Sequence, residues 1–204
     1  MKRAFNYSRA CYEEAYHGAE MKLAQADPAT YYDTAKKKHY HDREKEVWAK
    51  LPKPVSGTVL EVACSAGKSA FWMLEQFPAI KQMYMFDFSQ PAVDFCKRNP
   101  KFRDKTVIWQ GDVQKIACSD GMFDWVNCVD VTEHLPPAIY AKAIKEMLRV
   151  CKPGGHLILM AGSDKQCTEH IHLISDKVLV PDFVKAGWVR ELALPYRHFL
   201  LRKP

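Results

Sequence analysis

The chain has 204 residues, of which 48% are hydrophobic, and a formal net charge of +6. This size and apolar content are enough for one domain with a full hydrophobic core. The sequence contains no apolar run long enough to span a bilayer and no signal-peptide segment after its basic start. Its seven cysteines include no C-x-x-C pair, which indicates reduced thiols and a cytosolic location.

The first quarter of the chain differs from the rest. Residues 1–54 are rich in aromatic and charged residues and contain no strand-like run, so the pattern predicts two or three helices with a break near Asp27 and Pro28. Ordinary packing of aromatic side chains explains this composition as well as a binding role does. Residues 1–54 and 151–204 carry the excess positive charge, which favours an anionic substrate.

A short apolar run followed by small residues comes next. Residues 58–62 predict a buried strand, and the following ACSAG has almost no side-chain bulk. From Lys68 the apolar residues recur at helical spacing until Pro78 stops the helix. A strand, a tight loop and a helix N-terminus can bind a nucleotide, because free N–H groups and the positive end of the helix dipole face the ligand. An ordinary strand-to-helix turn with small residues for packing is the alternative.

Two phosphate-binding patterns fail on this stretch. The loop G-x-x-x-x-G-K-[ST] needs glycine at the position of Val62, although Gly67, Lys68 and Ser69 match its end. The fingerprint G-x-G-x-x-G also fails, because this loop has a single glycine. The sequence therefore predicts a cofactor loop without a phosphate grip, and a nucleoside triphosphatase is the last alternative.

Strands and helices then alternate along the chain. A second apolar run ends at Asp87, and this spacing from Gly67 is typical of an acidic side chain that accepts hydrogen bonds from ribose hydroxyls. Ser89 and Pro91 predict the start of a second helix. The pattern indicates further strands at residues 106–110, 125–129 and 156–161 and a long helix at residues 138–151. This alternation predicts a parallel sheet that binds ligands at the carboxyl ends of its strands.

Five segments of the chain resemble the motifs of a known family. They are VLEVACSAG, MFDFS, GDV, FDWVNCVDVTEHL and LRVCKPGGHLIL, and in this order they are similar to class I S-adenosylmethionine-dependent methyltransferases, particularly the small-molecule branch of ubiquinone and menaquinone biosynthesis. The resemblance covers residues 55–161. Residues 182–188 resemble the family's last helix, and residues 189–194 and 197–202 resemble its closing antiparallel strands.

The resemblance implies an α/β fold. This fold is a Rossmann-like, doubly wound, seven-stranded and mostly parallel sheet with a C-terminal antiparallel hairpin. Residues 55–204 would form the methyltransferase domain. Residues 1–54 would form an N-terminal helical cap that contributes to the substrate site of one compact unit.

The resemblance also implies a set of residues for the cofactor S-adenosylmethionine. Glu61 would lie near the methionine amino group, and Asp87 would hold the ribose hydroxyls. Asp112 would accept a hydrogen bond from the adenine amine, with Val113 beside the ring. The full expected set is Glu61, Ala63, Cys64, Ser65, Gly67, Asp87, Phe88, Asp112, Val113, Asp130 and Val131.

The cofactor loop departs from the family pattern at two positions. The family usually has glycine where this chain has Ala63 and Ser65, and glycine permits positive φ and close approach of the backbone. Each replacement adds bulk and is expected to weaken or reshape cofactor binding. A degenerate, non-enzymatic fold that serves as an interaction partner is therefore one alternative.

Histidines and one aspartate are the candidates for chemistry. His134 is the best-placed general base, since histidine titrates near neutral pH, and Asp130 is the second catalytic candidate. A capping or packing role is the alternative for His134. His170 and His172 have no further Cys or His at ligand spacing, so we expect no metal site. The expected substrate contacts are Tyr32, Tyr40, Arg43, His170 and His172.

These inferences predict a cytoplasmic enzyme that transfers a methyl group from S-adenosylmethionine to oxygen, nitrogen or carbon of a small metabolite, leaving S-adenosylhomocysteine. The expected partner is a small-molecule acceptor of anionic character, with no membrane partner, in a monomer or homodimer. An RNA- or protein-modifying methyltransferase is the first alternative. The net charge is modest for a nucleic-acid binder, and the sequence has no recognisable RNA or DNA module.

Overall fold

The computed structural model describes residues 38–162, 172 and 174–204, with side chains from residue 41 onward. Tyr32 and His170 therefore lie outside the described residues, as does the side chain of Tyr40. Helix α4 (Lys38–Trp48) is the described part of the expected N-terminal cap.

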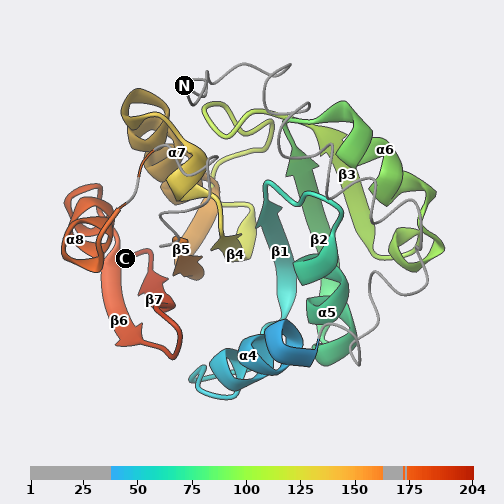
Figure 1. Ribbon diagram of the computed structural model, residues 1–204, viewed down its shortest axis with the longest axis horizontal. Helices are drawn as coiled ribbons and strands as arrows, with labels where there is room; N and C mark the ends of the chain where they lie inside the picture. Colours follow the sequence, from blue (N-terminus) through green and yellow to red (C-terminus); the bar gives the residue numbers. More distant parts are fainter. Residues whose placement is uncertain (1–37, 163–171, 173) are drawn as a thin grey trace, which may run out of the picture.

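A seven-stranded sheet forms the centre of the structure (Figure 1). Its strand order is β3-β2-β1-β4-β5-β7-β6, and all neighbours are parallel except the pairs that β7 makes with β5 and β6. The strands are β1 (Gly57–Val62), β2 (Ile80–Asp87), β3 (Thr106–Gln110), β4 (Phe123–Val129), β5 (Cys151–Met160), β6 (Val189–Ala193) and β7 (Phe199–Arg202). The predicted mostly parallel sheet with an antiparallel C-terminal hairpin is confirmed.

Helices cover both faces of this sheet, because the strands carry apolar side chains on both of their sides. On one face, α4, α5 (Lys68–Gln76) and α6 (Gln90–Arg98) pack against strand residues that include Val59, Met83 and Trp125. On the other face, α7 (Pro137–Val150) and α8 (Asp176–Lys185) pack against Leu60 and Val126, among others. None of the helices in the described part of the chain has the length and apolar character that a bilayer span requires.

Local sequence signals determine where the helices near the site begin. The Ser89 hydroxyl accepts a hydrogen bond from the Ala92 N–H at 3.4 Å and caps α6, as predicted. Gly67 precedes α5 with φ of +78°, and a Cβ there would lie 2.7 Å from the Phe102 ring. The loop before α5 therefore requires glycine at this position for both conformation and space.

Two elements differ from the expected ranges. Strand β5 begins at Cys151 and includes the Lys-Pro-Gly-Gly segment that we expected to separate helix from strand, because Cys151 pairs with Phe123 and Gly154 donates to the Lys203 carbonyl. Helix α8 begins at Asp176 and continues through Pro181, whereas we placed its start after this proline. Burial of Leu179, Val180 and Phe183 on the sheet outweighs the lost hydrogen bond.

Candidate cofactor site

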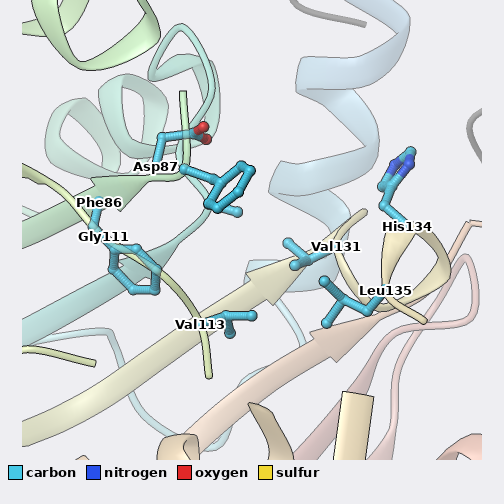
Figure 2. A pocket seen from close by; sticks show the side chains of 9 residues that line it. Phe86, Asp87, Gly111, Val113, Val131, His134 and Leu135 are labelled. Carbon is cyan, nitrogen blue, oxygen red and sulfur yellow. The ribbon is translucent and has the colours of Figure 1, made fainter. Parts of the chain in front are cut away.

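A cavity opens at the carboxyl ends of β1, β2, β3 and β4, with about 410 Å³ of empty space that includes open solvent at its mouth (Figure 2). Parallel strands carry their ligands at this edge of the sheet, on both sides of the central strand where the order reverses. The lining is mostly apolar, with Asp87 and His134 on opposite sides of the cavity. The lining residues are Ala63, Phe86, Asp87, Phe88, Gly111, Val113, Val131, His134 and Leu135.

The loop between β1 and α5 approaches this cavity in a left-handed conformation. Ala63 has φ of +52° and Ser65 has φ of +49°, and Gly67 follows with a positive φ. Positive φ is thus needed at the two positions where the resemblance led us to expect glycine. The alanine and serine side chains are small enough for the loop to keep this shape, although non-glycine residues adopt it at a cost of about 1 kcal/mol each.

Asp87 holds the loops after β1 and β2 together. Its two carboxylate oxygens accept hydrogen bonds from the N–H groups of Ser65 and Ser89, each at 2.8 Å, and its side chain is almost fully buried. A carboxylate has about four acceptor positions, so capacity for further donors is left. Asp87 is therefore both a support of the cofactor loop and an acceptor at the cavity wall.

Glu61 lies in the central strand, below the loop. It is 5% exposed, and the Asn127 side-chain amide donates to its carboxylate at 2.8 Å and to the Ser69 hydroxyl oxygen at 3.1 Å. Burial raises the pKa of the Glu61 carboxyl to about 8, and the charge of Glu44 adds to this shift. Glu61 does not line the cavity. Its carboxyl group is fixed by Asn127 of β4, whose amide also contacts Ser69 of α5.

The loop after β3 forms the third part of the site. Asp112 accepts hydrogen bonds from the main chain and the side chain of Gln114, and Val113 lines the cavity. Gly111 is at the cavity wall, where a Cβ would lie 2.8 Å from Trp109 Nε1 and 3.1 Å from the Phe86 ring. The Trp109 and Phe86 rings stack with their centroids 5.4 Å apart, so Trp109, which does not line the cavity itself, supports the lining ring of Phe86.

The loop after β4 supplies the remaining wall and the acid–base candidates. Asp130 is exposed and has φ of +54°, whereas His134 is 3% exposed and lines the cavity. Between them, Glu133 is fully buried and accepts a hydrogen bond from the Gly162 N–H. Burial raises the pKa of Glu133 to about 8, with Asp130 as the next contribution.

The described candidates for acceptor contact are Arg43 and His172. Arg43, on α4, is 3.5 Å from the Glu44 carboxylate, and its charge reaches Asp130. The His172 N–H donates to the Glu133 carbonyl, and its ring meets Tyr140 edge-on at 5.2 Å. In the part of the chain that the structure describes, no three His, Cys, Asp or Glu side chains are placed to hold a metal ion.

The cavity is lined by some of the expected residues and by others that were not expected. Expected residues in its wall are Ala63, Asp87, Phe88, Val113, Val131 and His134, whereas Glu61, Cys64, Ser65, Gly67, Asp112 and Asp130 are not lining residues. Phe86, Gly111 and Leu135 were missed. Gly111 had a detectable signal, since a small residue directly after a strand end permits close approach.

The described residues fit the adenosine part of S-adenosylmethionine. A flat aromatic base suits the apolar wall of Phe86, Val113 and Leu135, and ribose hydroxyls suit the Asp87 carboxylate.

Comparisons with known proteins support this fit. Residues 59–155 match the family described as "Methyltransferase domain". The tRNA N(3)-methylcytidine methyltransferase trm141 of Schizosaccharomyces pombe is 30% identical over 128 residues, which cover 60% of this chain and 51% of that protein. Demethylmenaquinone methyltransferase of Bacillus licheniformis is 21% identical over 150 residues, covering 69% of this chain and 64% of that protein. The chain thus spans between half and two thirds of the length of these relatives.

A solved structure gives the same fold. The N-methyltransferase NodS of Bradyrhizobium japonicum, in complex with S-adenosylhomocysteine, superposes with a TM-score of 0.70 at 19% identity and covers 93% of this chain and 98% of its own. The fold is therefore the Rossmann-like fold of class I methyltransferases. Residues 59–155 match the methyltransferase domain family, and the remaining described strands and helices complete the sheet.

Proposed function

We propose that the whole protein transfers a methyl group from S-adenosylmethionine to a small metabolite. The cavity at the carboxyl ends of β1 to β4, with Asp87 in its wall, is the observation that supports this function most directly. The cofactor supplies an activated methyl group when bound. The residues of the chain have to bind it, orient the acceptor toward it and exclude water.

We assign roles to the site residues on the basis of their position. Asp87 holds the ribose, and the aromatic and aliphatic wall around Val113 holds the adenine. Glu61 faces the methionine ammonium through the base of the loop. His134, at the far side of the cavity from Asp87, receives a proton from the acceptor where the reaction releases one, with Asp130 as the second acid–base group.

Three further proposals concern the rest of the protein. Residues 1–54 act as a cap on the acceptor side, since Arg43 of α4 already contributes charge next to Asp130. Arg43 is the group on this side that would attract an anionic acceptor. The cytosol is the proposed compartment, because Cys64, Cys96, Cys118, Cys128 and Cys151 are free thiols.

RNA is the second candidate acceptor, and the similarity to trm141 favours it. That relative acts on tRNA according to its name, whereas the second relative acts on demethylmenaquinone according to its name. The modest net charge of +6 supports the small acceptor.

Calorimetry with S-adenosylmethionine and S-adenosylhomocysteine tests the cofactor site. We expect the unmodified protein to bind and Asp87→Ala to bind at least tenfold more weakly. The variant removes the proposed ribose acceptor, and the Ser65 N–H of the loop loses the carboxylate to which it donates. Asp94→Ala is the matched control, since Asp94 lies on α6, accepts a hydrogen bond from the Gln90 side chain at 2.7 Å and does not line the cavity. A folded protein that binds neither compound would disprove the proposal.

Transfer of a labelled methyl group then separates the two acceptor classes. The acceptors are a naphthoquinol, a panel of small anionic metabolites, and tRNA from cells that lack tRNA methylation. Label in a small molecule supports the proposal. Label in tRNA alone, lost on raising the salt concentration, establishes the second candidate instead.

A further inference from the structure

The turn after β4 is short and depends on its surroundings for support. It contains η3 (Thr132–His134), a 3₁₀-helix of three residues. Its own hydrogen bonds run from the His134 N–H to the Val131 carbonyl and from the Leu135 N–H to the Thr132 carbonyl, at 3.1 and 3.2 Å. Such short 3₁₀ segments have poor hydrogen-bond geometry. Val131, His134 and Leu135 line the cavity, so the contacts that hold this turn also fix one wall of the cavity.

Glu133 joins this turn to two other segments of the chain. Its side chain is fully buried, and its Oε1 accepts a hydrogen bond from the N–H of Gly162, just after β5. Its main-chain carbonyl accepts a second hydrogen bond, at 2.9 Å, from the N–H of His172. One residue therefore holds the end of β4 against the end of β5 and against the chain that leads to α8.

Both of these segments are themselves held in place. The Asp130 N–H donates to the Met160 carbonyl at 3.2 Å, which joins the ends of β4 and β5 a second time. The His172 ring meets the Tyr140 ring of α7 edge-on, with the centroids 5.2 Å apart. Glu133 thus connects the turn to β5 and, through His172, to α7.

Glu133 and His134 are neighbours in the chain but have different surroundings. In a 3₁₀-helix, successive side chains point about 120° apart. Accordingly, Glu133 is buried against the end of β5, whereas His134 lines the cavity (Figure 2). A rotation of the turn that broke the hydrogen bond of Glu133 to Gly162 would also move the His134 ring out of its place in the wall.

A carboxyl group at a fully buried position is costly, and an apolar side chain would fill the same space without that cost. Burial raises the pKa of Glu133 to about 8, so the group is mostly protonated at neutral pH. A protonated carboxyl can accept from Gly162 through one oxygen and donate through the other, and the Asp130 side chain is hydrogen-bonded to it. Glutamine can make both kinds of bond and is the natural conservative replacement.

We propose that Glu133 is a positioning residue for methyl transfer, which fixes His134 in the cavity wall by holding its turn to Gly162 and His172. Glu133 does not line the cavity and acts through His134. A displacement of about 1 Å at reacting groups can lower a rate about 100-fold, so the orientation of this turn matters for transfer. The inference rests on the proposed function and adds a residue to it.

NMR of protein with ¹³C-labelled histidine tests this role without an acceptor, with His134→Gln to assign the signal among the eight histidines. S-adenosylhomocysteine should shift the His134 signal and leave that of His198, which is buried and does not line the cavity, unchanged. Glu133→Gln should show the same shift. Glu133→Met has similar length but no acceptor for the Gly162 N–H, and it should lose most of the shift while binding S-adenosylhomocysteine within about threefold of the unmodified protein.

Transfer of a labelled methyl group to the naphthoquinol probe gives a second readout. Glu133→Met should lower kcat at least about tenfold and change the KM of the acceptor by less than about threefold, whereas Glu133→Gln should stay within about twofold in both. Ile144→Val is the control for a loss of stability alone, since Ile144 is buried on α7 and does not line the cavity. It should keep both the rate and the His134 shift.

Equal His134 shifts in Glu133→Met and the unmodified protein would overturn the inference and leave the proposed function intact. A loss of S-adenosylhomocysteine binding in Glu133→Met that matches its loss of kcat would also overturn it, because Glu133 would then support the whole cavity. If Glu133→Met does not fold, Glu133→Asp replaces it, since its carboxyl is one methylene farther from Gly162. Failure of the unmodified protein to bind S-adenosylhomocysteine would overturn the proposed function instead.

Discussion

The left-handed residues of the cofactor loop show how the chain keeps a glycine-type turn without the usual glycines. Ala63 and Ser65 have positive φ, and Asp87 fixes the loop through the Ser65 N–H. The strain is local and is offset by a charge-assisted hydrogen bond, which contributes roughly 1.5–3 kcal/mol. The departure from the family pattern therefore does not by itself indicate a degenerate loop.

Ala63→Gly should stabilise the protein by about 1 kcal/mol, because glycine adopts positive φ without steric cost. Urea unfolding measures the difference. Ala66→Gly is the control in the same loop, and it should destabilise the protein by about 1 kcal/mol, since Ala66 is fully buried and is not among the positive-φ residues. Equal losses of stability in the two variants would contradict the strain at Ala63.

Gly111→Ala should weaken binding of S-adenosylhomocysteine about tenfold, or about 1.4 kcal/mol. The added methyl group would lie 2.8 Å from Trp109 Nε1 and 3.1 Å from the Phe86 ring, so it should displace this cavity-lining ring. Calorimetry gives the affinity. Gly121→Ala is the control for a loss of stability alone, because its φ of +60° strains the variant while its Cβ would approach only Pro153, at 3.9 Å. An unchanged affinity in Gly111→Ala would place the adenine elsewhere.

At the scale of single residues, the sequence predicted those parts of the site that follow strand ends. Asp87, Val113 and Val131 each follow or end a strand, and all three line the cavity. Phe86 was missed because it precedes Asp87 within the apolar run, where core packing is the usual role of phenylalanine. Phe86 also pairs and stacks with Trp109 of β3, and strand patterns do not reveal such a pairing.

At the scale of elements, one arginine on α7 holds the long connection between β3 and β4. Arg149 donates to the carbonyls of Ile116 and Cys118 and pairs with Glu146, while Glu146 accepts from the Ile116 N–H. This connection carries Val113 into the cavity wall, so α7 supports the Val113 side of the cavity from a distance.

Arg149→Met should destabilise the protein by about 1–2 kcal/mol, because it leaves two carbonyl groups and the Glu146 carboxylate without their donor. Hydrogen exchange should become faster in residues 112–122 and remain unchanged in β1. Lys145→Met, an exposed neighbour on the same helix, is the control. Unchanged exchange in residues 112–122 would mean that the connection is held by its own contacts.

The elements show which parts of a fold periodicity can predict. Strand β3 was predicted with its exact observed bounds, because its apolar run is short and clearly delimited. The start of β5 was misplaced, because the Lys-Pro-Gly-Gly segment has turn composition but bonds to the distant Lys203. Helix α8 was shortened for the same reason: tertiary burial outweighed the local signal of Pro181.

At the scale of the whole molecule, the number of strands and the closing antiparallel hairpin came from the resemblance and not from periodicity. Local patterns give no information on which strands are neighbours, and the strand order was not predicted. The contacts between α4 and the β6–β7 turn, such as Tyr196 with Glu46, join residues 150 positions apart and were not predicted either. The confirmed sheet with its antiparallel hairpin therefore depends on the family motifs, whereas the strand order and the contacts of α4 depend on the structure.

Buried carboxyl groups also determine how the stability of the whole molecule depends on pH. Glu61 and Glu133 have a pKa of about 8 in the folded protein, against an ordinary value of 4.5, mainly because both are buried. A raised pKa means that the folded state favours the protonated form. The stability that these two groups contribute is therefore complete below pH 4.5 and is lost as the pH rises toward 8. Glu146 has the opposite sign, because the hydrogen bond from Arg149 lowers its pKa and its contribution is lost in acid.

The free energy of unfolding should therefore be greatest near pH 5 and fall by roughly 3–6 kcal/mol between pH 5 and pH 8. Urea unfolding across this range measures the decrease. Glu61→Gln and Glu133→Gln together should make the curve nearly flat, because glutamine keeps the shape of the side chain without titrating. Glu75→Gln, exposed on α5, should leave the slope unchanged. Stability that increases from pH 5 to pH 8 would show that both carboxyl groups are ionised in the folded protein.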